Sequence, residues 1–252
     1  NYNVPFRSNL KIYKNTIFAA NQNNNLFFFN KLTGEILKQI PTEETIVKNN
    51  FINSLSLDEK NIFFLNTYGT LYSVDIKSKR INWFINLNQS LDINPNNMFN
   101  GSQIINSGGK IITSSNQFLY ILDSKTGSII FKKNFPILIN PLIINDILFL
   151  VSKKNFLISF DLNKNKIIYS YNINTKIADF LKNKKKNADL KNIIMAEGKL
   201  LLFLKNSHIL VFNTRGNLEK VNKLPGKMNT FPILIENRIL FLDKKNKLTI
   251  VN

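Results

Sequence analysis

The sequence contains no cysteine and only one histidine, His208, among its 252 residues. Without cysteine the chain can form no disulfide, no thiolate nucleophile and no cysteine-ligated metal site. Nucleophilic triads and most zinc sites need a histidine together with a nucleophile or with further metal ligands, and the sequence offers His208 no such partners. We expect His208 to be a solvent-facing residue in a turn between two strands, and the chain to have no catalytic residue, no metal site and no cofactor.

Acidic residues are also few, with 16 Asp and Glu against 34 Lys and Arg. Glu43 and Glu44 form one adjacent pair, and Asp58 and Glu59 form another. Adjacent loop residues do not create the opposed carboxylates of a glycosidase. We therefore expect both pairs to lie in solvated loops.

Long hydrophobic runs are missing as well. Lys, Asn or Asp interrupts every apolar run well short of the ~20 residues that a membrane-spanning helix needs. Residues 1–5 carry neither the basic region nor the apolar region of a signal peptide. We expect no membrane-spanning helix, and we expect that a targeting segment has been removed or that the sequence is a fragment.

The net charge of +18 raises the question of nucleic-acid binding. Such binding usually relies on a clustered basic stripe or patch, whereas Lys, Asn and Ile are frequent here in turns and strands alike. The most basic local run, Lys182–Lys186, is interpreted as a solvated insert in preference to a phosphate or anionic-lipid contact. We expect no nucleic-acid partner.

What fills the sequence is a repeat. An apolar strand, a polar turn, an alternating aromatic strand and a closing Asn or Asp recur six times. The copies close at Asn30, Asp75, Asp123, Asp161, Asn213 and Asn252. A spacing of roughly 40 to 50 residues is typical of propeller blades.

Each copy adds an opening strand before this pair and, after a tight turn, a fourth strand. Gly34, Gly127 and Gly216 supply the positive φ that three of these turns need. The repeat therefore predicts an all-β fold, a single β-propeller domain spanning residues 1–252 with six four-stranded antiparallel blades, the last of which stops after its third strand. The expected blades are approximately residues 7–40, 51–88, 100–135, 139–174, 190–224 and 229–252, with only a short helical turn around Ile177 to Lys186.

The turn strings carry a family resemblance. Residues 122–131, Leu-Asp-Ser-Lys-Thr-Gly-Ser-Ile-Ile-Phe, and residues 74–83, Val-Asp-Ile-Lys-Ser-Lys-Arg-Ile-Asn-Trp, resemble the repeat of pyrroloquinoline-quinone-type propellers. All six copies fit this pattern to some degree. Within that superfamily, the order of long and short connections and the segment Ser90–Asn94 resemble the BamB-like family of outer-membrane protein assembly factors.

This resemblance implies an eight-bladed propeller. We accordingly expect the six visible blades to be the C-terminal six of eight, with two further blades, a signal peptide and a lipid-bearing cysteine upstream. The resemblance also implies a lipoprotein on the periplasmic side of the outer membrane, attached to that membrane only through the upstream anchor.

The resemblance further implies a non-catalytic scaffold that docks to the β-barrel assembly machinery through a BamA-like protein. The long connections, residues 41–50, 88–100, 175–191 and 223–229, are expected on one face, because turns between the second and third strands share that face with the links between blades. In BamB-like proteins two adjacent interblade loops there contact BamA. The matching positions here are Ile46, Val47, Lys48 and Asn49 in the first loop and Asp92 and Asn94 in the second. Asn49 and Asn94 depart from the basic and acidic types of the family, and the start of a strand explains Ile46 and Val47 equally well.

Two alternatives stay open: a quinone-dependent dehydrogenase-like propeller and a generic protein-binding propeller. Enzymatic members of the superfamily hold the quinone with a calcium site, a stacking tryptophan and often a disulfide of adjacent cysteines. Trp83 is the single tryptophan here, and it stands at the Trp position of the repeat, where the ring is expected to pack between blades. Leu37, Phe131, Tyr169 and Val221 take that position in other copies, which packing permits and cofactor stacking would not.

Overall fold

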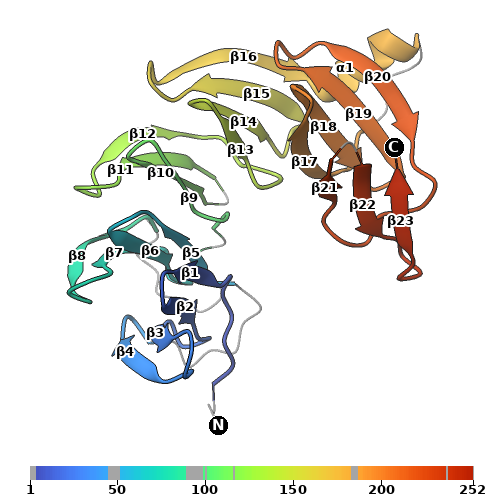
Figure 1. Cartoon of the computed structure of the whole chain (residues 1–252). Helices are drawn as coiled ribbons and strands as arrows, with labels where there is room; N and C mark the ends of the chain where they lie inside the picture. The colour runs from blue at the N-terminus through green and yellow to red at the C-terminus, as the bar shows by residue number, and fades with distance from the viewer. Residues whose placement is uncertain are drawn as a thin grey trace. The chain divides into compact units, whose positions relative to one another are not determined.

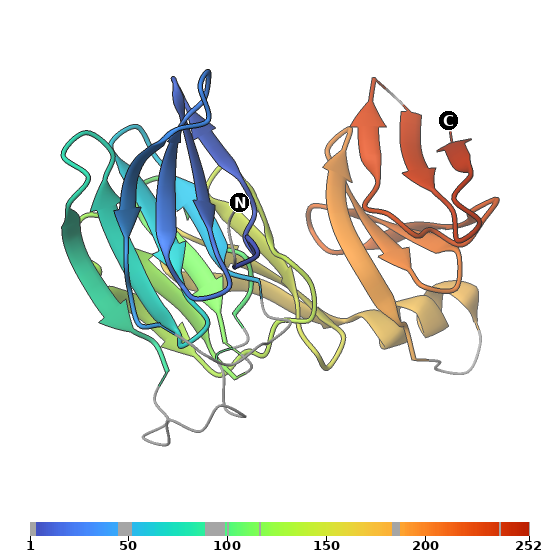
Figure 2. The same ribbon diagram turned by 90° about the horizontal axis from the view of Figure 1, so that it is seen from below.

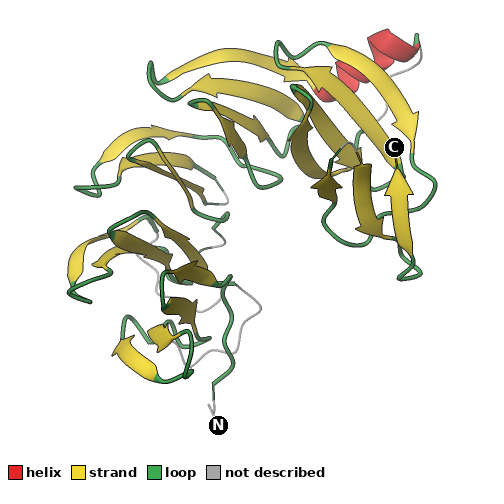
Figure 3. Cartoon of the chain, in the orientation of Figure 1, coloured by secondary structure: helices red, strands yellow, loops and turns green. Residues whose placement is uncertain are grey.

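The computed structural model describes residues 4–44, 52–88, 99, 101–115, 117–182, 187–236 and 238–251. The chain divides into two compact units, Asn1–Pro136 (unit 1) and Ile137–Asn252 (unit 2). Both units are built from antiparallel sheets, and the described residues include one helix (Figure 3). No helix among the described residues is long and apolar enough to cross a membrane.

Unit 1 contains three four-stranded sheets in chain order (Figure 1). In each sheet the strands pair with their sequence neighbours, so the connections run up and down without crossovers. The strands are β1 (Lys11–Tyr13), β2 (Thr16–Ala20), β3 (Leu26–Asn30), β4 (Ile36–Ile40), β5 (Ser54–Leu57), β6 (Asn61–Leu65), β7 (Thr70–Asp75), β8 (Ile81–Asn86), β9 (Ile105–Ser107), β10 (Lys110–Ser114), β11 (Leu119–Asp123) and β12 (Ile129–Lys133).

Unit 2 contains two four-stranded sheets and one three-stranded sheet with the same up-and-down order. Its elements are β13 (Leu142–Ile144), β14 (Ile147–Val151), β15 (Phe156–Asp161), β16 (Lys166–Asn172), α1 (Ile173–Leu181), β17 (Leu190–Ala196), β18 (Lys199–Leu204), β19 (His208–Asn213), β20 (Leu218–Lys223), β21 (Ile233–Ile235), β22 (Arg238–Leu242) and β23 (Leu248–Val251). A small up-and-down sheet is the repeated unit, or blade, of a β-propeller, and the described residues of this chain form six such sheets in succession. The predicted fold class is confirmed, including the three strands of the last copy.

The central strands of the second sheet are apolar on both faces because the first and third sheets each cover one face. In β6, Phe63 and Phe64 are both fully buried and point to opposite sides. Phe64 joins the core between the first and second sheets, where it meets Phe18 and Phe28. Phe63 joins the core between the second and third sheets. This two-sided burial explains why the central strands read as continuous apolar runs.

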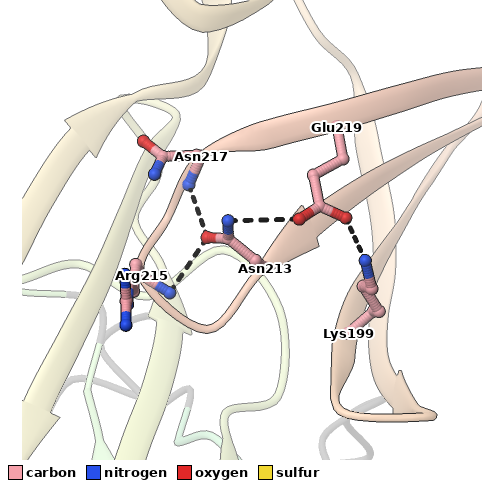
Figure 4. Close-up of polar contacts among 5 residues, drawn as sticks. All are labelled: Lys199, Asn213, Arg215, Asn217 and Glu219. Atoms are coloured by element: carbon pink, nitrogen blue, oxygen red, sulfur yellow. Dashed lines mark hydrogen bonds and ion pairs between the residues drawn. The ribbon is translucent and has the colours of Figure 1, made fainter.

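The turns that precede the fourth strands are held by Asn or Asp side chains. In the turn between β19 and β20, Asn213 Oδ1 accepts hydrogen bonds from the backbone N–H of Arg215 at 3.1 Å and of Asn217 at 3.0 Å (Figure 4). Gly216 adopts φ 79° in this turn. The closing Asn or Asp of the repeat thus fixes the turn that follows it.

The helix corrects one expectation. It begins at Ile173 and ends at Leu181, four residues earlier than the short turn predicted around Ile177. Asn172 caps the helix by accepting a hydrogen bond from the Thr175 N–H at 3.0 Å. Ile173, the first residue of the helix, is fully buried. The cap and this buried side chain set the start of the helix, and part of the predicted long loop 175–191 is therefore helical.

We call the end of a sheet that carries the turn between its second and third strands its loop end. The link to the next sheet leaves from the same end, because the strands run up and down. In unit 2, α1 and the turn from β22 to β23 both lie at the lower end of the sheets as drawn in Figure 2. In unit 2 the helical connection and this turn therefore lie at the loop end, where loops on a rigid scaffold can be presented.

Candidate docking surface

The residues predicted to bind a partner, Ile46, Val47, Lys48, Asn49, Asp92 and Asn94, lie outside the described residues. The chain on either side of them is described: Pro41 to Glu44 lead into the first loop, and Phe99 follows the second. These flanking residues contact the turn between β6 and β7 at the loop end of unit 1.

Asn24 anchors the entry to the first loop. It lies fully buried in the turn between β2 and β3, with φ 65°, a left-handed conformation that Asn tolerates better than most residues. Its Nδ2 donates to the backbone O of Glu43 at 3.0 Å, and its backbone O accepts from Thr42 Oγ1. Its Oδ1 accepts from Thr67 Oγ1 at 3.0 Å. One side chain therefore joins the first sheet, the loop entry and the second sheet.

Glu43 makes the second anchor. Its Oε2 accepts hydrogen bonds from Thr70 Oγ1 at 2.7 Å and from Asn66 Nδ2 at 2.9 Å. Charge-assisted hydrogen bonds of this kind are stronger than neutral ones. Glu43 lies at the exposed surface, as expected, but its carboxylate is also bound to the turn between β6 and β7.

Tyr72 lies against this carboxylate. Burial raises the pKa of the Tyr72 hydroxyl to about 12, and the negative charge of Glu43 adds to the increase. Tyr72 is buried, and its ring stacks on that of Phe84 with centroids 5.8 Å apart. Tyr72 therefore lies between the Glu43 carboxylate and the exposed ring of Phe84.

Phe99, which follows Asp92 and Asn94 in the chain, contacts the same turn. The Phe99 N–H donates to the Thr67 backbone O at 2.9 Å. The Phe99 ring is buried against two glycines, since a Cβ atom on Gly69 would lie 2.6 Å from it and one on Gly101 would lie 2.9 Å from it. The turn between β6 and β7 therefore binds two residues that are far apart in the sequence. It binds Glu43, which precedes the first loop, and Phe99, which follows Asp92 and Asn94.

Beside these anchors lies an open groove of about 860 Å³. Phe84 on its wall is 67% exposed and Ile81 is 42% exposed. Exposed apolar side chains around a concave surface are typical of a protein-binding site. The groove is lined by Pro41, Thr42, Glu43, Tyr72, Ile81, Asn82, Trp83 and Phe84.

Trp83 takes the packing role predicted for it. A Cβ atom on Gly127 would lie 2.6 Å from the Trp83 ring, so the ring covers the turn between β11 and β12. Its Nε1 donates to the Ser124 backbone O at 3.2 Å. Tyr169 covers Gly216 in the same way in unit 2. The tryptophan that would have to stack on a quinone is thus engaged in joining two sheets, and the residues present do not fit that cofactor.

His208 is the first residue of β19, at the end of the predicted turn. Its Nδ1 lies 3.1 Å from the backbone O of Asn206. Within the ranges that the structure describes, no three His, Cys, Asp or Glu side chains are placed to hold a metal ion. Asp58 acts locally, accepting from the Lys60 N–H at 2.8 Å and the Asn61 N–H at 2.6 Å.

Sequence reasoning missed the anchoring roles of Asn24, Glu43 and Phe99. Asn24 carried a signal, because Asn in a polar turn is a candidate for left-handed backbone. Glu43 and Phe99 carried none, since their partners lie on a turn more than 20 residues away in the chain. Only the packing of consecutive sheets brings them together.

Comparison with solved structures supports the fold. The chain is similar to BamB from Moraxella catarrhalis, with a TM-score of 0.72 and 12% identity over 96% of this chain and 70% of that one. It is also similar to the quinohemoprotein alcohol dehydrogenase from Comamonas testosteroni, with a TM-score of 0.62 and 9% identity over 98% of this chain and 46% of that one. At these identities both likenesses show a shared propeller fold and nothing about activity.

Comparison of sequences identifies the family. No curated protein sequence matches the chain. The family model described as outer membrane protein assembly factor BamB matches residues 4–133, which is more than half of the chain and nearly all of unit 1. The chain belongs to the BamB family of outer membrane protein assembly factors.

Proposed function

We propose that this protein is a non-catalytic propeller scaffold that docks to the machinery for assembling β-barrel proteins, on the periplasmic side of the outer membrane. The direct partner in this proposal is a BamA-like protein. The proposal rests on the family and on one structural observation: the turn between β6 and β7 binds Glu43 and Phe99, the described residues that flank the two loops predicted to bind the partner. A rigid base under two loops keeps the entropy cost of binding low.

The groove gives the proposal a contact that can be tested on described residues. Phe84 is exposed, aromatic and supported from below by Tyr72. Aromatic residues that are held in place before binding are frequent hot spots of protein interfaces. Phe84 lies beside Pro41 and Thr42, a few residues before Ile46, so a partner seated on the first loop would reach it.

The experiment measures binding of the purified chain to a detergent-solubilised BamA-like protein from the same organism. Phe84→Ser is expected to weaken binding by about 30-fold, the loss typical of a hot-spot residue. Leu32→Ser is the matched control, because Leu32 is 81% exposed and lies on the turn before β4, at the opposite end of its sheet. Wild-type protein that does not bind, or equal losses in both variants, would contradict the proposal.

The dehydrogenase alternative shares the fold of the Comamonas enzyme. It is disfavoured by Trp83, whose ring lies on Gly127 and whose Nε1 is hydrogen-bonded to Ser124. Dye-linked oxidation of alcohols by the chain after incubation with pyrroloquinoline quinone and Ca²⁺ would establish the enzyme and remove the scaffold proposal.

A further inference from the structure

The loop end of unit 2 collects positive charge. Among the described residues, lysines lie on the helix end, on the turn between β18 and β19, on the link between β20 and β21 and on the turn between β22 and β23, all at this end of the sheets. At the opposite end, the turns that join first to second strands carry Asp146, Glu197 and Glu236, and the turns that join third to fourth strands carry Lys164 and Arg215. We call the basic group at the loop end the lysine face: Lys182, Lys191, Lys205, Lys227 and Lys244.

Contacts between these segments make the lysine face continuous. Lys191 Nζ donates to the backbone O atoms of Met228 and Asn229, both at 2.7 Å, which ties β17 to the next link. The Lys244 N–H donates to the Lys227 backbone O at 2.9 Å, which joins that link to the last turn. The start of β17, the link between β20 and β21 and the turn between β22 and β23 therefore bring their lysines to one area.

The lysines lie close enough to affect the pKa of Lys191. The pKa of Lys191 is lowered, first by burial and then by the positive charges of Lys244 and Lys205. Lys205 forms an ion pair with Asp189 at 2.8 Å. Asp243 is occupied within its own turn, where its Oδ1 accepts from the Lys245 and Lys247 N–H groups. A bound anion would relieve the remaining repulsion.

The helix adds apolar side chains beside this charge. Ile173 of α1 is buried and Ile177 packs on the core of unit 2. Phe180 and Leu181, in the last turn, are 45% and 44% exposed and stand directly before Lys182. A short amphipathic helix with an exposed aromatic residue next to lysines is typical of segments that lie in a membrane interface.

The helix and the lysines belong to one surface. Asn174 Oδ1, in the first turn of α1, accepts from the Ala188 N–H at 2.8 Å. The next residue, Asp189, accepts a backbone hydrogen bond from the Lys205 N–H at 2.8 Å. The chain of contacts thus runs from α1 through residues 188–189 to the lysine face.

We propose that the lysine face and the end of α1 bind the surface of a bilayer containing anionic phospholipids. The lysines would lie at the phosphate groups, and Phe180 and Leu181 would enter the boundary between headgroups and acyl chains. Charge complementarity selects an anion, and the exposed apolar pair selects a lipid surface over a nucleic acid, which would leave both side chains in water. This contact goes beyond the proposed protein docking and uses the other unit. Residues 183–186 of the basic run, expected to be a solvated insert, lie outside the described residues.

The experiment is flotation of the full chain with vesicles of phosphatidylcholine alone or with about 30% phosphatidylglycerol. Wild-type protein is expected to bind only the anionic vesicles and to be released by about 0.5 M NaCl, because salt screens exposed charges. The triple variant Lys182→Glu, Lys227→Glu, Lys244→Glu is expected to bind at least about 100-fold more weakly, since each lysine near an anionic surface contributes about fivefold.

The matched control reverses three charges at the opposite end of the sheets: Lys164→Glu, Lys166→Glu and Arg215→Glu. It has the same net charge as the triple variant, so it is expected to keep most of the binding if position matters. Equal losses in the two variants, or no preference of the wild type for anionic vesicles, would overturn the proposal. Circular dichroism of each variant checks that it is folded.

A second variant tests the apolar part. Phe180→Ser with Leu181→Ser leaves the charge unchanged and is expected to weaken vesicle binding by about tenfold or more, because two buried apolar side chains are lost from the interface. Unchanged binding by this variant would contradict insertion. Competition of a short DNA duplex against vesicles, with tighter binding to the DNA, would replace the lipid surface by a nucleic acid and also overturn the proposal.

Discussion

The indole ring of Trp83 on β8 lies over Gly127, in the turn between β11 and β12 of the next sheet. The approach is so close that a Cβ atom on Gly127 would lie 2.6 Å from the ring, and the Trp83 Nε1 donates to the Ser124 backbone O in the same turn. The fourth strand of one sheet is thereby joined to the turn before the fourth strand of the next.

This contact makes Gly127 intolerant of a side chain. Gly127→Ala is expected to lower the free energy of unfolding by about 2–5 kcal/mol, through left-handed strain and overpacking against Trp83 together. The measurement is urea unfolding followed by far-UV circular dichroism.

Gly34 provides the control for backbone strain alone. It adopts φ 75°, close to the φ 73° of Gly127, but nothing lies within 4 Å of its Cβ position. Gly34→Ala is therefore expected to cost only the ~1–2 kcal/mol of a left-handed alanine. If both alanines destabilise the protein equally, the packing role of Trp83 is contradicted.

The periodic parts of this structure could be predicted from the sequence. Alternating and continuous apolar runs located the strands, and the recurring Gly and Asp turns located Trp83 at a contact between sheets. Both are local patterns, set by which face of a strand is covered. The three-stranded last sheet followed from the same pattern.

The anchors of the candidate site could not be predicted in this way. Glu43 binds Asn66 and Thr70, and Phe99 packs on Gly69, only because the packing of neighbouring sheets brings these segments together. The start of α1 was missed for a different reason. Asn172 is a good capping residue, but the helix has only nine residues, so its apolar pattern covers too few turns to fix where it begins.

Asn24 is expected to be the most sensitive residue of the candidate site. Asn24→Ala would remove its bonds to Glu43 and Thr67 and place alanine at φ 65°. The free energy of unfolding is expected to fall by about 3 kcal/mol, because the buried polar partners of Asn24 are left without hydrogen bonds. Thermal and urea unfolding would measure it. Asn23→Ala in the same turn serves as the control, and a loss as large as that of Asn24→Ala would show that the hydrogen bonds are not the cause.

Tyr72 gives the protein a stability change at high pH. Burial and the charge of Glu43 raise the pKa of its hydroxyl to about 12, above the ~10 of an unfolded tyrosine. The neutral phenol is therefore favoured by folding, its stabilisation is fully present below pH 10, and it is lost as pH rises toward 12.

Ultraviolet absorbance of tyrosinate tests this directly. Tyr72→Phe is expected to remove one late-titrating tyrosine and to flatten the fall in stability between pH 10 and 12 relative to wild type. Tyr169, whose pKa burial also raises to about 12, should continue to titrate late in this variant. A variant that loses stability with pH as steeply as the wild type would contradict the role of Tyr72.

Asn213 should not tolerate the aspartate that other copies of the repeat carry at the same position. Its Nδ2 donates to Glu219 Oε1 at 3.2 Å, and the other carboxylate oxygen of Glu219 is paired with Lys199 (Figure 4). Lys199 is the main cause of the lowered pKa of Glu219, and the Asn213 hydrogen bond contributes. Because this pKa is depressed, the stabilisation by Glu219 is present above its unfolded pKa and is lost as pH falls through the folded value.

Asn213→Asp would replace the donor with a second carboxylate facing Glu219. We expect it to raise the pKa of Glu219, to destabilise the protein at pH 7, and to do so less at pH 4, where protonation of either carboxyl group removes the repulsion. Titration of the glutamate side-chain carbonyls by NMR, together with thermal unfolding at both pH values, would measure this. Asn30→Asp is the control: Asn30 Oδ1 accepts only the turn N–H groups of Leu32 and Thr33 among the described hydrogen bonds, which an aspartate would keep. Equal destabilisation by the two aspartates, or an unchanged pKa of Glu219, would show that the Asn213–Glu219 hydrogen bond does not set the preference for asparagine here.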